Sequence, residues 1–377
     1  MPPSPAAPAA AMRAFLDPAP TRLDAHRAAP LTRGALERMP KWLICVPLAL
    51  QWLWLGLRYG SLTLPSAANP GITSGGLVGE GKLEYFAAMG PRALAATATH
   101  CAVRNAGASV ATMVRTQVAE AGLAYPLVAK PDLGLCGHGV RRIDSEDALL
   151  AYLADFPRGE TVVLQEYLPE AGEAGIFYAR DPATGRGAII GLALRTFPHV
   201  VGDGTSTVAD LVAADARARR ALSSRWHQAG FDPTAVPAAG AVVRLATIGS
   251  TRVGGLYRNG EDCITPELLA AMDAIADDMP RFHAGRFDVR FETLAALRAG
   301  TGLRIMEVNG AGSEAIEAWD PDIGLVDAFR RIFRKQALLF AIGAARRREG
   351  ARPIGLLQLA RLNRRQLRLI EHYPRSN

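Results

Sequence analysis

Lysine is scarce in this chain. Of its 43 basic residues only four are lysines, namely Lys41, Lys82, Lys130 and Lys335. Arginine is therefore the default cation, and a lysine kept against this background can mark a place where a compact ammonium group is needed. Chance retention explains the same count. The scarcity directs attention to Lys82 and Lys130 without giving them a role.

Cysteine is also sparse, and its spacing shows no pairs. The four cysteines are scattered, with no C-x-x-C spacing, at Cys45, Cys101, Cys136 and Cys263. This pattern argues against a disulfide framework and against a zinc site. It predicts a protein of the reducing cytoplasm.

The N-terminal part lacks an apolar run long enough to span a bilayer. Residues 42–57 are apolar, but these 16 residues are interrupted by Pro47 and Gln51. Their length favours a helix buried in the first subdomain. Three tryptophans and the flanking Lys41 and Arg58 favour a segment at a membrane interface. Residues 1–38 are rich in Ala and Pro, so we expect disorder with at most a short helix, and no signal peptide.

The positive charge belongs to one end of the chain. The net charge is +7, yet the segment from Arg330 to the end holds 13 basic and 2 acidic residues, a local balance of +11. The remaining chain has 30 basic and 34 acidic residues and carries −4. We expect basic amphipathic helices packed on the body at residues 330–368. Contact with an anionic membrane, together with 42–57, stays open, and nucleic acid is disfavoured because no binding motif or interleaved aromatics are present.

Residues 125–143 (YPLVAKPDLGLCGHGVRRI) predict a β-hairpin with a glycine-rich tip. An apolar run ends on Lys130, three glycines follow, and residues 140–143 return as extended chain. Backbone N–H groups in such a turn can bind phosphate. The dinucleotide fingerprint does not apply, because that motif opens a helix. Taken alone, an ordinary hairpin loop explains the sequence equally well.

The loop at residues 65–82 contains the spacing of a P-loop. Gly76 to Lys82 matches G-x-x-x-x-G-K, but Leu83 stands where a Ser or Thr should bind magnesium. No hydrophobic strand precedes the loop either. The P-loop interpretation is therefore disfavoured.

Two later segments carry oxygen ligands. Residues 285–291 (GRFDVRF) alternate strictly, which places Arg286, Asp288 and Arg290 on one face of a strand. In residues 303–310 (LRIMEVNG), Glu307 and Asn309 share a face, while Met306 and Val308 are expected in the core. If the strands pair, Asp288, Glu307 and Asn309 converge as a magnesium site. A pair of salt-bridged strands is the alternative.

Other segments read as alternating helices and strands. We expect strands at 161–164, 174–179 and 188–194, and further strands joined by a turn within 241–258. We expect helices at 83–89, 110–122, 145–156 with Ser145 as N-cap, and 266–279 capped by Thr265. Another helix should follow Ser206 or Thr207, with the arginines between 217 and 225 on its solvated face.

Together these motifs resemble the ATP-grasp ligases, of the D-alanine–D-alanine ligase, cyanophycin synthetase and glutathione synthetase types. The resemblance covers residues 82–315 and is carried by KPDLGLCGHGV, VLQEYLPEAGE, VVGDGTSTVADLV, RFDVRF and MEVNG in that order. It implies an α+β ATP-grasp fold with two α+β subdomains that grip ATP. The expected organisation is a disordered tail (1–38), a short Trp-rich region (39–81), the grasp domain (82–320) and a basic helical segment (321–377).

The resemblance also implies the site residues, with ATP and magnesium or manganese as cofactors. The metal ligands would be Asp288, Glu307 and Asn309, and the catalytic groups Arg286, Arg195 and His199. The nucleotide would be bound by residues that share contact with phosphate, adenine or ribose: Lys82, Lys130, Gly137, His138, Gly139, Glu166, Tyr167, Leu168 and Glu173.

The implied function is an ADP-forming carboxylate–amine ligase that acts through an acyl phosphate. An ATP-grasp phosphotransferase and a nucleotide-binding module without turnover stay open, as does homo-oligomerisation. The partners would be a small carboxylate and a small amine. The short region before Lys82 and the residues after Asn309 (GAGSEA) depart from the family pattern, so both substrates stay undetermined.

Overall fold

The computed structural model describes residues 34–107, 110–170, 172–223, 232–246 and 249–376. These residues fold into two compact units that do not follow the linear order of the chain. Unit 1 lies within Met1–Ala98, Glu170–Leu194 and Tyr257–Arg365, and unit 2 within Thr99–Pro169, Arg195–Leu256 and Gln366–Asn377. The proposed boundaries at 38, 81 and 320 stay predictions.

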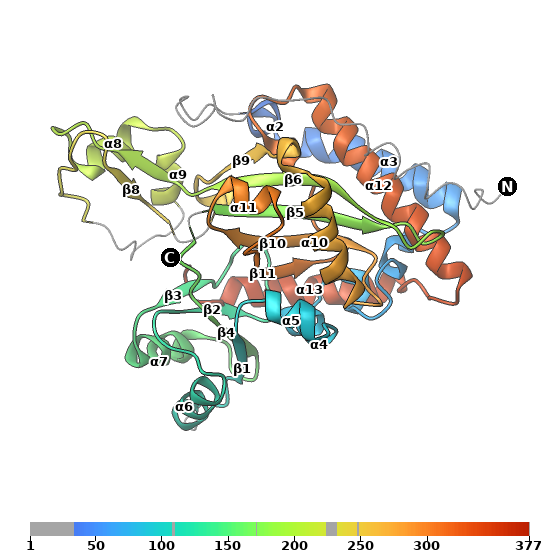
Figure 1. The fold of residues 1–377 in the computed structure, drawn as a ribbon, viewed down its shortest axis with the longest axis horizontal. Coiled ribbons are helices and arrows are strands. Elements are labelled where there is room, and N and C mark those ends of the chain that lie inside the picture. The colour runs from blue at the N-terminus through green and yellow to red at the C-terminus, as the bar shows by residue number, and fades with distance from the viewer. Residues whose placement is uncertain (1–33, 108–109, 171, 224–231, 247–248, 377) are drawn as a thin grey trace. The chain divides into compact units, whose positions relative to one another are not determined.

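A five-stranded sheet forms the centre of unit 1 (Figure 1). Its strand order is β11 (Arg304–Asn309), β10 (Ala284–Phe291), β5 (Gly172–Arg180), β6 (Gly187–Thr196) and β9 (Leu256–Asn259), and β10 is antiparallel to both neighbours. Alternation along β5 sends Phe177 to a core shared with α12 (Leu325–Arg348), whereas the Tyr178 hydroxyl donates to Asp273 of α10 (Pro266–Asp277) at 2.6 Å. The sheet is therefore covered by a different helix on each face.

Further helices complete unit 1. They are α2 (Ala35–Arg38), α3 (Lys41–Tyr59), α4 (Lys82–Ala87), α5 (Pro91–Ala96), α11 (Leu294–Arg298) and the first part of α13 (Leu356–His372). Single turns of 3₁₀-helix lie at Leu64–Ala67, Thr73–Gly76, Glu261–Cys263 and Ile316–Trp319. The basic C-terminal segment thus forms two helices, α12 and α13.

Unit 2 contains a four-stranded antiparallel sheet with the order β1 (His100–Arg104), β4 (Thr161–Glu166), β2 (Leu127–Pro131) and β3 (Arg141–Ile143). Side chains from α6 (Val110–Glu120) and α7 (Glu146–Asp155) pack on it in one apolar core. A second, smaller core joins β7 (His199–Val201) and β8 (Val242–Arg244) with α8 (Val208–Ala214) and α9 (Ala218–Ser223).

Several local predictions are confirmed by hydrogen bonds. The side chains of Ser145, Thr207 and Thr265 accept from the backbone N–H three residues later and cap α7, α8 and α10. These caps satisfy N–H groups that the first turn of a helix leaves without a partner. Residues Leu127–Ile143 form the expected hairpin, with Leu127 opposite Ile143.

One prediction about residues 207–258 is wrong. Arg217 is buried before the separate helix α9, and its guanidinium donates to the Gly255 carbonyl at 2.9 Å, so it does not lie on the solvated face of α8. The strands expected within 241–258 are present as β8 and β9, but they belong to different sheets, because β8 pairs with β7 and β9 joins the sheet of unit 1. The end of the predicted arginine segment, residues 224–225, lies outside the described residues.

The apolar segment at residues 42–57 is a helix, but it is not a buried one. In α3 only Ile44, Leu55, Gly56 and Tyr59 are buried. Among the described residues, α3 alone is long and apolar enough to cross a membrane, a test that core helices and signal sequences also pass. Most of the predicted disordered tail, residues 1–33, lies outside the described residues, and Ala35–Arg38 form one helical turn.

Asn69 joins two parts of unit 1 that are far apart in sequence. Its side-chain amide donates to the carbonyls of Gly75 (3.0 Å) and Ala284 (2.8 Å), and its oxygen accepts from the N–H groups of His283 (2.8 Å) and Ala284 (3.1 Å). The side chain is fully buried. It therefore holds the loop before Lys82 against the beginning of β10.

Replacing Asn69 by Ala should lower the free energy of unfolding by about 2–4 kcal/mol, because four buried backbone groups lose their partner. Thr184→Ala, in an exposed turn of the same unit, is the control and should change it by less than about 0.5 kcal/mol. Urea denaturation of both variants measures the difference. Equal stabilities would contradict a structural role for Asn69.

Candidate functional site

The candidate metal ligands lie on two paired strands of unit 1. In the antiparallel register, Asp288 of β10 is opposite Glu307 of β11, and Arg286 is opposite Asn309. The expected pairing of these strands is confirmed. A register shift after Asp288 leaves Met306 out of the pairing, and Met306 is half-buried beside the Arg290 guanidinium rather than in the core. This β-bulge explains why strict alternation fails at Met306.

Each carboxylate of this pair is bound by a cation. The Arg286 guanidinium donates to both oxygens of the buried Asp288, at 2.7 and 3.1 Å, and the Asn309 amide donates to Asp288 at 3.2 Å. The Lys82 ammonium lies 3.3 Å from a Glu307 oxygen. The salt-bridged strands considered as an alternative are therefore present, and they bring all five side chains together.

The donor set fits a hard divalent cation. Two carboxylates and one amide offer the oxygen ligands that magnesium prefers, and few protein ligands suffice because magnesium keeps water and phosphate oxygens. Among the described residues, no group of three or more His, Cys, Asp or Glu side chains is placed to hold a metal. A metal at this position would therefore use Asp288, Glu307 and the Asn309 oxygen, and it would compete with Arg286 and Lys82.

Close backbone packing fixes the position of Lys82. The loop before it runs beside the end of β11, where Ala311 N–H donates to the Gly75 carbonyl (3.1 Å) and Gly312 N–H to the Gly76 carbonyl (2.6 Å). A Cβ at Gly76 would come within 2.5 Å of the Gly310 backbone, so glycine is required there. The P-loop interpretation is wrong, because a 3₁₀ turn (Thr73–Gly76) stands where a strand is needed.

Glu80 is a site residue that the sequence did not reveal. One of its carboxylate oxygens is buried and has no hydrogen-bond partner among the described residues. Burial raises the pKa of Glu80 to about 7, and the neighbouring Glu307 charge adds to the rise while Lys82 opposes it. The sequence offered one indication of Glu80, because this residue lies two residues before Lys82 in the segment that was considered as a P-loop.

Replacing Glu80 by Gln should make the free protein more stable above pH 7. Because the folded-state pKa is raised, the wild-type protein loses stability as pH rises from about 4.5 through 7, by up to about 3 kcal/mol. The Gln variant should lack this loss and match wild type near pH 4.5. Urea denaturation across this pH range measures the stability difference between the two proteins, with the exposed Glu292→Gln variant as control. If the stability of the Glu80→Gln variant depends on pH as that of the wild-type protein does, the raised pKa of Glu80 is refuted.

Glu173, the proposed ribose ligand, is buried in unit 1. It lies opposite Arg290 in the β5–β10 register, and one carboxylate oxygen is 3.4 Å from the Arg290 guanidinium. Arg290 also donates to the Glu170 carbonyl at 2.9 Å. Arg290 therefore holds both Glu173 and the segment that leads into β5, a role the sequence did not assign to it.

Lys130 stands at the end of β2 in unit 2. It is buried, and its ammonium donates to the side-chain oxygen of Gln165 on β4 at 2.7 Å. Gln165 is also buried and was not selected from the sequence. The amide fixes the ammonium group at the point where the glycine-rich turn begins.

The glycine-rich turn has an unusual backbone and a cation bound to it. Cys136, Gly137 and Gly139 all have positive φ angles, and a Cβ at Gly139 would lie 2.7 Å from the Pro131 ring. Arg252 donates to the carbonyls of Cys136 (3.2 Å) and Gly137 (3.4 Å). Burial, aided by Arg252, lowers the pKa of His138. Arg252 thus adds a positive charge to the predicted phosphate loop, and no motif indicated it.

The predicted adenine segment, Glu166 to Leu168, begins at the last residue of β4. The Glu166 carboxylate accepts from the Thr99 N–H at 2.8 Å, and its own N–H donates to the Thr99 carbonyl at 2.9 Å. The Arg142 guanidinium lies over the Tyr167 ring, 4.7 Å from its centroid, and Leu168 is buried. These contacts fix the backbone of the segment.

Arg195 and His199 lie near each other in sequence on two strands, β6 and β7. Both side chains are half-buried. A His199 ring nitrogen is 2.9 Å from the Phe197 carbonyl, which fixes the orientation of the imidazole. Their catalytic roles stay predictions.

No protein-family model and no curated protein matches the chain. Among solved structures, it is similar to a bifunctional glutathione synthetase from Pasteurella multocida, at 18% identity and a TM-score of 0.31, over 60% of this chain and 32% of that one. It is also similar to D-alanine–D-alanine ligase from Bacillus anthracis, at 15% identity and a TM-score of 0.41, over 74% of this chain and 71% of that one. A third similar structure is D-cycloserine synthetase DcsG, at 15% identity and a TM-score of 0.36, over 71% of this chain and 69% of that one.

The chain spans about one third of the length of the bifunctional synthetase. The first two of these structures are of enzyme types that the sequence motifs resemble.

Proposed function

We propose that the chain is an ATP-grasp ligase that uses ATP and magnesium or manganese to join a small carboxylate to a small amine. The observation that carries the proposal is the register of β10 and β11, which sets Asp288 opposite Glu307 and Arg286 opposite Asn309. Salt-bridged strands alone would account for the ion pairs. They do not account for the buried Lys130 at the base of a turn with consecutive positive φ angles.

The reaction follows from the weak reactivity of a carboxylate. Its oxygen would attack the γ-phosphorus of ATP while the bond to the β–γ bridging oxygen breaks, giving an acyl phosphate and ADP. The amine nitrogen would then attack the acyl carbon and lose a proton, and inorganic phosphate would leave. Such a sequence needs positioning and charge neutralisation more than a protein nucleophile.

In unit 1, Asp288, Glu307 and Asn309 would hold the metal, whose chemistry is to neutralise charge on the β- and γ-phosphates. Arg286 and Lys82 neutralise the same carboxylates in the free protein. When the carboxylates bind a metal, both cations become available to anionic groups. Arg286 would then stabilise the oxyanion that forms when the amine attacks.

In unit 2, Lys130 and the N–H groups of the turn at 137–139 would bind phosphate oxygens, with Arg252 adding charge. Backbone groups of 166–168 would bind adenine. Glu173 of unit 1 would bond the ribose hydroxyls through an oxygen not turned to Arg290. Arg195 and His199 would act near the transferred phosphoryl group.

Replacing Glu307 by Gln should reduce ADP formation by at least about 100-fold, because a metal ligand contributes several kcal/mol. Lys130→Met should cause a loss of similar size, since it removes the phosphate-binding cation from the other unit. Glu292→Gln, exposed at the end of β10, should keep wild-type turnover. A coupled ADP assay measures all three. Turnover retained by Glu307→Gln would contradict the metal assignment.

Hydroxylamine distinguishes ligation from phosphotransfer. With ATP, magnesium and a panel of amino acids and amphiphilic acids, we expect a hydroxamate that forms only when ATP and the accepted acid are both present. A stable phosphorylated substrate without hydroxamate would assign a phosphotransferase. Nucleotide binding without ADP release for any acid would assign a binding module.

A further inference from the structure

The outward face of α3 is a continuous apolar stripe. The exposed large side chains of this helix recur every three or four residues: Trp42, Leu43, Val46, Leu50, Leu53, Trp54 and Leu57. Leu57 is 82% exposed, Trp42 66% and Leu50 63%. No charged residue occurs from Trp42 to Leu57. Scattered apolar residues are normal on a protein surface, but a contiguous stripe of this kind marks an interaction site.

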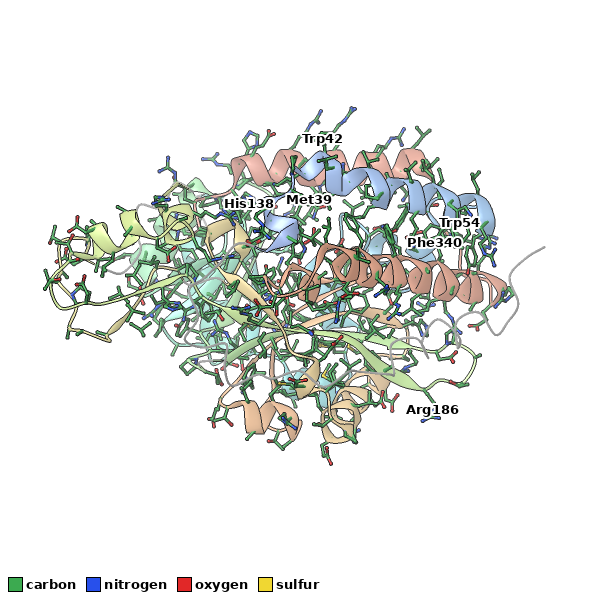
Figure 2. All side chains as sticks on the ribbon, turned by 90° about the horizontal axis from the view of Figure 1, so that it is seen from above. Met39, Trp42, Trp54, His138, Arg186 and Phe340 are labelled. Atoms are coloured by element: carbon green, nitrogen blue, oxygen red, sulfur yellow. The ribbon has the colours of Figure 1, made fainter. Side chains whose placement is uncertain are left out.

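The opposite face of α3 fixes the helix on unit 1. Leu55 and Tyr59 pack with Phe340 of α12, which lies between the two helices (Figure 2), and Trp52 meets the same ring edge-on at 5.0 Å. The Gln51 amide donates to the Phe333 carbonyl at 2.8 Å. A spanning orientation would break these contacts. The stripe therefore faces away from unit 1 along the side of the helix, as in a helix that lies in the plane of a membrane–water interface.

Cations flank the stripe at both ends. Arg58 follows it directly and lies 5.6 Å from the Trp54 ring centroid. Arg347 of α12 donates to the Tyr59 carbonyl at 2.9 Å, and the Arg348 charge acts on Tyr59 as well, which places both arginines at the same end. Lys41 stands at the other end, and α3 contains no acidic residue. Trp42 and Trp54 lie near the two ends of the helix (Figure 2).

The apolar surface continues past the helix. A groove of about 520 Å³ is lined by Trp52 and Leu53 of α3, Leu77 and Val78, and Leu356 and Leu359 of α13. Leu53 belongs to both the stripe and the groove, and Leu356 is 59% exposed. The apolar area is thus wider than one helix.

We propose that the stripe of α3 binds an anionic lipid surface, with its apolar side chains at the acyl boundary and Arg58, Arg347 and Arg348 on anionic headgroups. Tryptophans at the ends of an apolar segment and flanking cations are the features that suit a headgroup region. A second copy of the chain fits less well. If two stripes packed against each other in parallel or antiparallel orientation, the cations at each end of one stripe would lie against cations of the other and repel them.

Sedimentation of the full chain with vesicles tests the proposal. We expect pelleting with vesicles that contain phosphatidylglycerol, weaker pelleting with phosphatidylcholine alone, and a decrease with added salt. The double variant Leu50→Ser/Leu57→Ser should bind at least about tenfold more weakly, because two exposed leucines leave the bilayer. Leu94→Ser, an exposed leucine outside the stripe, is the matched control.

Charge variants separate the two contributions. Arg58→Gln/Arg348→Gln should weaken binding about tenfold or more and flatten the salt dependence, since each cation near the surface contributes about 1 kcal/mol. Arg186→Gln, on an exposed turn of the same unit, should have no effect. Brominated lipid should quench tryptophan fluorescence, and Trp42→Phe/Trp54→Phe should remove most of that quenching in a protein with an unchanged Tm.

Three outcomes would overturn the proposal. The first is equal pelleting of the wild-type and Leu50→Ser/Leu57→Ser proteins. The second is binding that appears only after residues 1–33 are removed, which would assign the stripe to that segment. The third is a dimer in light scattering that the leucine substitutions dissociate, without vesicle binding by the intact chain.

Discussion

The neutralisation of one buried carboxylate organises the candidate site. Asp288 is almost inaccessible to solvent, and an unpaired charge there would be strongly destabilising. In the free protein Arg286 meets this need with a bidentate contact from the same strand. A divalent cation would meet the same need, so metal and guanidinium would compete for the same oxygens. Such competition would link metal binding to the release of Arg286, and it would make the ion pair a part of the proposed chemistry rather than an alternative to it.

The second constraint is the close approach of the backbone on either side of this pair. Gly76 and Gly310 pack too tightly for a Cβ, and hydrogen bonds from Ala311 and Gly312 hold the loop that ends at Lys82. Asn69 anchors the same loop to the start of β10. The ammonium therefore reaches Glu307 because of packing between segments that are remote in sequence. The scarcity of lysine, which first drew attention to Lys82, contains none of this information.

Local patterns predicted the elements well, and remote contacts account for what was missed. Alternation and turn chemistry gave β10, β11, the hairpin and three helix caps. The exposure of α3 could not be predicted, because its sequence is apolar on both faces and only the packing of Phe340 decides which face is buried. Met306 was misplaced because a β-bulge breaks the two-residue period. Glu80, Gln165 and Arg252 have their roles through neighbours that no local pattern specifies.

Most of the few lysines of the chain share a feature in the structure. Lys82, Lys130 and Lys335 are all buried, and only Lys41 is exposed. The first two contact a carboxylate and an amide oxygen, and Lys335 lies 4.3 Å from the Phe177 ring centroid. Burial lowers the pKa of Lys335 to about 7, with Arg286 adding to the effect and Glu317 opposing it. Burial alone does not distinguish the two cations, because Arg217 and Arg290 are buried as well. The ammonium differs from a guanidinium in being a compact charge whose pKa changes readily on burial, and this difference applies to Lys335 as well, which the count alone did not select.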